Sequence, residues 1–107
     1  MNNAFDDREK GFETQLKVSQ DLEFRIAARR NKLLGEWLGE KLGLNQSEIP
    51  KFANTIVIAD LEEPGEEDVI RACIKAIQER HSELTVEDIR EKIVELDKVA
   101  LNQLKTD

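Results

Sequence analysis

Three groups of residues in this chain have the chemical types from which a functional site can be built. The first is an acidic run that contains Asp60, Glu62, Glu63, Glu66, Glu67 and Asp68. Carboxylate oxygens are the ligands of hard cations, but the order of these residues does not match the twelve-residue calcium-binding loop. A helix end, a turn and a helix start explain the acids without a metal, because acidic residues stabilise a helix N-terminus. We therefore expect no metal site in this run.

The second group is the only histidine and the only cysteine. A single histidine excludes a histidine-based metal cluster, and His81 is expected at the surface near a helix C-terminus. Cys73 lies among Ile70, Ile74 and Ile77, where a buried small apolar side chain is expected rather than a nucleophile. No glycine-rich phosphate motif occurs either. The sequence thus predicts no enzyme and no cofactor, and a small enzyme that holds a metal in the acidic run is the open alternative.

The third group is basic. Arg25, Arg29 and Lys32 share one face of a helix by their spacing, and Arg30 adjoins them. This face can bind an anion, a nucleotide phosphate or an acidic protein surface, whereas a solvated or internally paired face is the simpler interpretation. The net charge of −7 argues against general nucleic-acid binding, which needs clustered cations to release counterions from phosphates. We therefore expect a local basic face and no nucleic-acid partner.

Apolar spacing predicts that a long buried helix carries the basic face. Its apolar residues recur three and four apart, at Ile26, Leu33, Leu34, Trp37, Leu38 and Leu42. Gly35, Gly39 and Gly43 lie four apart, which forms a groove where a neighbouring backbone can approach, and the last of them is expected to end the helix. The helix start is expected at Ser19 or Asp21.

Three further amphipathic segments follow. The second helix is expected to be capped by Ser47, in preference to Asn45, with Pro50 in its first turn. A turn at Gly65 leads into a third helix, and a Thr85–Asp88 capping box begins a fourth. The inward residues are expected to be Ile49, Phe52, Ala53, Ile56 and Val57, then Val69, Ile70, Cys73, Ile74, Ala76 and Ile77, then Val86, Ile89, Ile93, Leu96 and Ala100. With 36% charged and 5% aromatic residues, the chain is expected to be an all-α helical bundle.

The N-terminal segment differs from the rest. Residues 1–19 carry few apolar side chains, so we expect a mobile arm, followed by one bundle domain over 20–107. Phe5, Phe12 and Leu16 are separated by seven and four residues, which would place them on one stripe if a partner made the arm helical. No window is apolar enough to span a membrane, and a single cysteine cannot form an internal disulfide. We expect a cytoplasmic protein that is monomeric when free.

Three motifs carry a resemblance to a known family. They are Phe5-Asp6-Asp7-Arg8-Glu9, the stretch from Ala28 to Trp37 (Ala-Arg-Arg-Asn-Lys-Leu-Leu-Gly-Glu-Trp), and Glu62-Glu63-Pro64-Gly65 with Asp68-Val69. In this order, and over a chain of this length, they resemble the ATPase inhibitor zeta subunit family of certain bacterial F-type ATP synthases.

The resemblance implies a small four-helix bundle with a mobile arm that becomes helical and inserts into a subunit interface of the synthase's catalytic head. It would block ATP hydrolysis and locate the protein at the inner membrane through the synthase, without membrane insertion. The arm residues that the resemblance implies for partner binding are Phe5, Asp6, Asp7, Arg8, Glu9, Phe12, Glu13 and Leu16. Arg25, Arg29 and Lys32 would help to seat the bundle. The alternative is an adaptor that binds an acidic partner through this basic face, with the arm as an idle tail.

Overall fold

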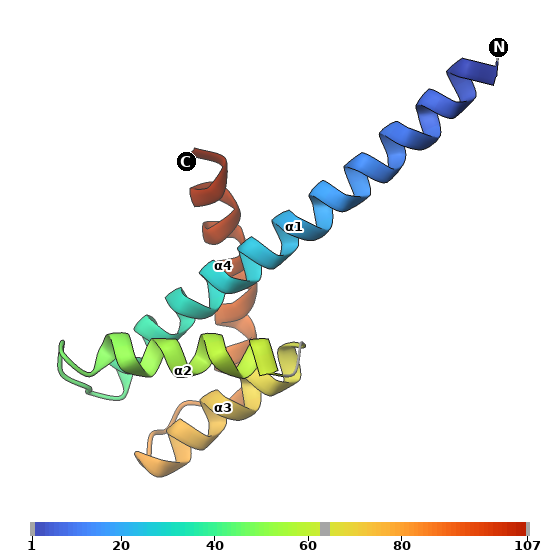
Figure 1. Ribbon diagram of the computed structural model, residues 1–107. Coiled ribbons are helices and arrows are strands. Elements are labelled where there is room, and N and C mark those ends of the chain that lie inside the picture. The colour runs from blue at the N-terminus through green and yellow to red at the C-terminus, as the bar shows by residue number, and fades with distance from the viewer. Residues whose placement is uncertain (1, 63–64, 107) are drawn as a thin grey trace.

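Four helices make up the fold of the protein in this computed structural model (Figure 1). The structure describes the backbone of residues 2–62 and 65–106, and the side chains of residues 20–61 and 65–105. The helices are α1 (Asn2–Lys41), α2 (Ile49–Glu62), α3 (Glu66–Glu79) and α4 (Val86–Thr106). The described residues contain no strand. The predicted all-α four-helix fold is therefore confirmed.

Helix α1 is much longer than the other three. Its 40 residues form one continuous helix of about 60 Å. The helix start expected at Ser19 or Asp21 is wrong, because the backbone remains helical through both positions. The C-terminal half of α1 packs against α2 and α4, and the N-terminal half projects beyond the other helices (Figure 1). The molecule consequently measures 65 × 26 × 22 Å.

The core lies between the four helices, with α1 and α3 each packed against both α2 and α4. Its fully buried apolar side chains come from the positions that the apolar spacing predicts, with Leu34 and Leu38 from α1, Ile56 from α2, Val69 and Cys73 from α3, and Ile89 and Ile93 from α4. Burying such side chains is the main favourable term in folding, at about 1.5–3 kcal/mol for each large aliphatic residue. Trp37 packs against this core, and the ammonium of Lys92 lies 5.2 Å from its ring centroid.

The close approach of a neighbouring backbone that the glycine spacing predicts is present at Gly35, and the neighbour is α2. A Cβ atom added to Gly35 would lie 2.5 Å from the Cα of Ala53, and one added to Gly39 would lie 3.3 Å from Ile49 Cγ1. Gly43 has a φ of 78° and ends α1, where its N–H donates to the Glu40 carbonyl and the N–H of Leu44 donates to Gly39. This pair of hydrogen bonds is a Schellman motif, for which glycine is favoured because it lacks a Cβ.

The other helix ends follow the predictions except one. The Oδ1 atom of Asn45 accepts hydrogen bonds from the backbone N–H groups of Ser47 and Glu48, so Asn45 caps the start of α2 and the preference for Ser47 was wrong. At α4 the N–H of Thr85 donates to Asp88 Oδ2 at 2.9 Å, and the N–H of Asp88 donates to Thr85 Oγ1 at 3.2 Å. The predicted capping box is therefore confirmed.

His81 ends α3 in a left-handed conformation, with a φ of 54°. The N–H of Ser82 donates to the Ile77 carbonyl at 3.0 Å, as in the motif at Gly43. A non-glycine residue in this conformation is destabilised, because its Cβ approaches a backbone carbonyl. We expect His81→Gly to raise the free energy of unfolding by about 0.5–1 kcal/mol. The gain is not larger because glycine also increases the conformational entropy of the unfolded chain. Urea unfolding measures this change. A variant less stable than the unaltered chain would contradict the claim that the backbone at His81 is strained.

Candidate functional site

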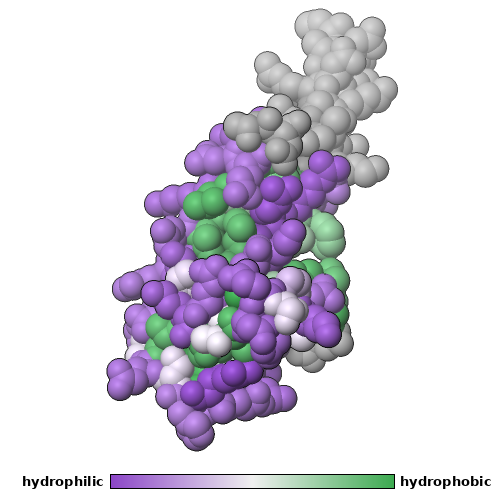
Figure 2. Space-filling view, turned by 90° about the vertical axis from the view of Figure 1, so that its left-hand side faces the viewer, coloured by the Kyte–Doolittle hydropathy of each residue, from purple (hydrophilic) through white to green (hydrophobic). Residues whose placement is uncertain are grey.

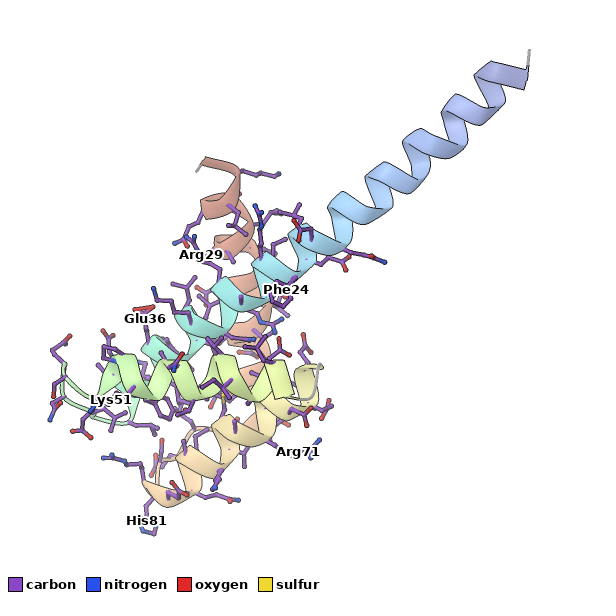
Figure 3. The ribbon with its side chains drawn as sticks, in the orientation of Figure 1. Phe24, Arg29, Glu36, Lys51, Arg71 and His81 are labelled. Carbon is purple, nitrogen blue, oxygen red and sulfur yellow. The ribbon has the colours of Figure 1, made fainter. Side chains whose placement is uncertain are left out.

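The predicted basic face lies on α1 where this helix leaves the bundle. Arg25 Nη2 is 3.6 Å from Asp21 Oδ2 in an exposed pair one helical turn apart, and Lys32 is exposed. Arg29 Nη1 donates a hydrogen bond to Gln103 Oε1 of α4 at 3.2 Å. Figure 3 shows Arg29 on the side of α1 that faces the C-terminal part of α4. The structure thus brings all three predicted residues to one exposed region.

Arg30 does not belong to this face, although it adjoins Arg29 in the sequence and was predicted beside the other cations. Its side chain is 8% exposed and reaches from α1 to α4, where Nη1 donates to Asp97 Oδ1 at 3.2 Å. Nε and Nη2 donate to Asn31 Oδ1 at 3.1 and 3.0 Å, and Nη1 lies 3.7 Å from Glu66 Oε1 of α3. Arg30 therefore joins α1, α3 and α4. Its four-residue spacing from Leu34 was the signal for an inward position.

Asn31 is completely buried beside Arg30. Its Oδ1 is occupied by the guanidinium, whereas its Nδ2 has no hydrogen-bond partner among the described residues. An unsatisfied buried amide N–H group costs free energy. The Arg30–Asn31 cluster therefore fixes the relative positions of α1, α3 and α4 more than it adds to the net stability of the fold.

We expect Asp97→Ala to lower the free energy of unfolding by about 2 kcal/mol, because it removes the nearer carboxylate from a guanidinium that stays buried. Asp21→Ala, which breaks the exposed pair with Arg25, is the matched control, with an expected loss of about 0.3–0.5 kcal/mol. Chemical denaturation of both variants measures the difference. Equal losses would show that the Arg30 cluster does not connect the helices as described.

Two adjoining hollows form a groove along α1 beside the basic face. One, of about 380 Å³, is lined by Phe24, Arg25, Ala28, Arg29, Lys32 and Leu104. The other, of about 480 Å³, is lined by Ala28, Lys32, Glu36, Pro50, Ala53, Asn54 and Val57. They share Ala28 and Lys32, and we call the combined feature the α1 groove. Phe24, which no sequence pattern indicated, is 60% exposed at one end of this groove and is labelled in Figure 3.

The other predicted partner-binding residues lie in the N-terminal half of α1. The side chains of Phe5, Asp6, Asp7, Arg8, Glu9, Phe12, Glu13 and Leu16 are outside the described residues. The backbone that carries them is helical, since α1 begins at Asn2. If that helix is regular, intervals of seven and four residues put Phe5, Phe12 and Leu16 along one stripe. Their role in binding stays a prediction.

The carboxylates of the acidic run whose side chains the structure describes, at Asp60, Glu66, Glu67 and Asp68, are used in structural contacts. Asp60 Oδ1 accepts a hydrogen bond from the N–H of Gly65 at 3.3 Å, and Asp68 Oδ1 is 2.7 Å from Arg71 Nη2. Glu67 Oε1 pairs with Arg90 Nη2 at 3.4 Å between α3 and α4. Glu63 and Pro64 lie outside the described residues. No group of three or more metal-ligating side chains occurs in the described part of the chain.

Cys73 is fully buried in the core, as predicted. Burial disfavours the charged thiolate and raises the pKa of Cys73 from 9.0 to about 12. The thiol therefore stays protonated near neutral pH and is not a nucleophile.

The surface, seen on one face in Figure 2, is mostly hydrophilic with small apolar patches.

Comparison with known proteins identifies the family. The family model for the ATPase inhibitor subunit zeta matches residues 1–103. The chain belongs to this family. The zeta family consists of regulatory subunits, so the prediction that the chain is an ATPase inhibitor and not an enzyme is confirmed. A search of curated proteins gave no match. Among the described residues of this zeta subunit, no helix is long and apolar enough to cross a membrane.

Proposed function

We propose that this protein inhibits ATP hydrolysis by inserting its N-terminal arm, as a helix, into a catalytic subunit interface of the F-type ATP synthase head. The observation that carries this proposal is the continuity of α1, whose N-terminal half projects beyond the bundle as one helix (Figure 1). A projecting helix can enter an interface that the bundle is too wide to enter. The family match includes this half of α1, which supports a role for it in inhibition.

The residues of the arm divide into two roles. Phe5, Phe12 and Leu16 form the proposed apolar stripe, and aromatic anchors of this kind carry much of the binding energy in protein interfaces. The charged residues set the register of the helix in the interface and disfavour wrong positions, and they are Asp6, Asp7, Arg8, Glu9 and Glu13. Glycine is about 1 kcal/mol less favourable than alanine within a helix, so Gly11 destabilises the helical form of the free arm. Part of the binding energy is therefore used to order the arm.

The bundle holds the arm and contributes its own contacts. Arg25, Arg29 and Lys32 lie between the arm and the core, where they are positioned to contact the surface around the entry point of the arm. We propose that the protein is a monomer when free. We also propose that it locates to the inner membrane as a peripheral component, held there by the synthase.

A matched pair of substitutions tests the arm. Phe12→Asp places a charge on the proposed apolar stripe, and Thr14→Asp places the same charge two residues on, about 200° around the helix. We expect Phe12→Asp to weaken inhibition roughly 30-fold, which corresponds to about 2 kcal/mol, and Thr14→Asp to weaken it much less. Titration of each variant into the purified synthase head, with ATP hydrolysis as the readout, makes the comparison. Equal effects of the two variants would contradict insertion of the arm through this stripe.

A further inference from the structure

The α1 groove is a concave surface at the place where α1 leaves the bundle. Its Phe24 end lies next to Leu104 of α4, and its other part is lined by Pro50, Ala53, Asn54 and Val57 of α2. Three helices therefore fix its walls. A groove that is held by three packed helices is largely preformed, which reduces the entropy lost when a partner binds.

Apolar groups line both parts of the groove. Phe24 is 60% exposed, and Leu104 and Ala28 are partly exposed beside it. The small side chain of Ala28 leaves the space that both hollows share. An exposed aromatic ring next to such a space offers a contact for an aliphatic or aromatic side chain of another molecule.

The rim of the Phe24 end is positively charged. The described residues that line this hollow include Arg25, Arg29 and Lys32 and no carboxylate. This concentration of cations contrasts with the net charge of −7 of the whole chain. The pair between Arg25 and Asp21 is 66% and 69% exposed, so solvent screens it and Arg25 can exchange to another carboxylate.

From this combination we infer that the α1 groove is a second docking surface, which takes an acidic amphipathic segment of the inhibited ATPase. An apolar side chain of that segment occupies the hollow beside Phe24, and flanking carboxylates contact Arg25 and Lys32. A free phosphate would use the cations but not the apolar lining, so the apolar and basic parts together favour a protein segment. The identity of the partner rests on the proposed function.

The groove and the arm lie on the same helix, so they can bind the same enzyme together. Once the groove is occupied, the arm is held near its own site at a high effective concentration. The groove therefore raises the affinity, whereas the arm stops hydrolysis. Loss of the groove lowers affinity without lowering the inhibition reached at saturation, and loss of the arm lowers that inhibition.

Two substitutions in the full chain test the groove. Ala28→Trp fills the shared space, and Lys32→Glu reverses a charge on an exposed residue without altering the core. Lys75→Glu, on the exposed surface of α3 and outside both hollows, is the control for the change in charge. Binding to the purified ATPase head of the same source is measured directly, and hydrolysis is measured at saturating concentrations of each variant. Circular dichroism verifies that each variant is folded.

We expect Ala28→Trp and Lys32→Glu each to weaken binding about 10-fold or more, with unchanged maximal inhibition. We expect Lys75→Glu to change the binding affinity by less than about 2-fold. Added salt is expected to weaken binding of the unaltered chain more than binding of Lys32→Glu. Unchanged affinity of both groove variants overturns the inference. If the unaltered chain binds without inhibiting, the proposed function fails while the groove comparison still stands. If it does not bind, both proposals fail.

Discussion

Deletion of residues 1–16 is expected to remove inhibition of ATP hydrolysis and to leave the bundle folded. Every buried side chain of the described residues lies at or after Arg30, so the deletion removes no part of the described core. The thermal midpoint of unfolding should therefore change by only a few degrees. The inhibitory effect should fall more than about 1000-fold, because all the proposed anchors of the arm are lost together.

Two measurements on the truncated chain separate the outcomes. Thermal unfolding followed by circular dichroism reports on the bundle, and hydrolysis by the synthase head reports on inhibition. A folded truncated chain that still inhibits fully would contradict the proposed role of the arm. An unfolded truncated chain would show that the N-terminal half of α1 stabilises the bundle, contrary to the division at residue 19.

Gly35→Ala is expected to cause the largest loss of stability of any single methyl addition on α1. The new Cβ would lie 2.5 Å from the backbone Cα of Ala53 and 3.0 Å from its Cβ. Carbon atoms in contact prefer about 3.5–4.0 Å, so α1 and α2 would have to move apart. We expect a loss of about 3 kcal/mol in the free energy of unfolding, although alanine favours the helix by about 1 kcal/mol over glycine.

Gly39→Ala is the matched control, one helical turn further along the same face. Its Cβ would meet Ile49 Cγ1 at 3.3 Å, and this flexible side chain can shift by a few tenths of an ångström. The gain in helix propensity is the same, so we expect stability within about 1 kcal/mol of the unaltered chain. Urea denaturation of both variants makes the comparison. If Gly35→Ala is as stable as Gly39→Ala, the close approach at Ala53 is not what fixes the distance between α1 and α2.

Local signals predicted most of the fold because each has a simple physical cause. The Thr85–Asp88 pair satisfies free N–H groups at the start of α4, and Gly43 adopts the positive φ that ends α1. Apolar spacing identified the buried face of every helix. The segment from Ile56 to Ala59 is helical in α2, as the spacing predicts for Ile56 and Val57, although its residue types favour a strand.

The features that were missed have different causes, and only the burial of Arg30 depends on contacts between distant residues. Arg30 is buried because Asp97 and Glu66, far along the chain, meet its guanidinium. The choice of Asn45 over Ser47 as a cap depends on the local backbone path, which composition does not specify. Ser19 and Asp21 are good capping residues, yet α1 continues through them, since a capping residue permits a helix start without requiring one.

The candidate site was predicted in part. Arg25, Arg29 and Lys32 were identified from their spacing, because residues three and four apart share a helix face. The groove beside them was not, because it is formed by Leu104 of α4 and Val57 of α2, whose positions beside α1 follow from packing. Phe24 was missed for the same reason, since its exposure is a property of the assembled bundle.

The most direct test of the central claim is cross-linking of the arm to the synthase head. A photoreactive amino acid at position 12 should form cross-links to the catalytic or noncatalytic subunits in the inhibited complex. The same amino acid at position 98, on the exposed surface of α4, controls for random contact. We predict strong cross-linking from position 12 that exceeds cross-linking from position 98. Inhibited complexes without cross-links from position 12 would contradict insertion of the arm.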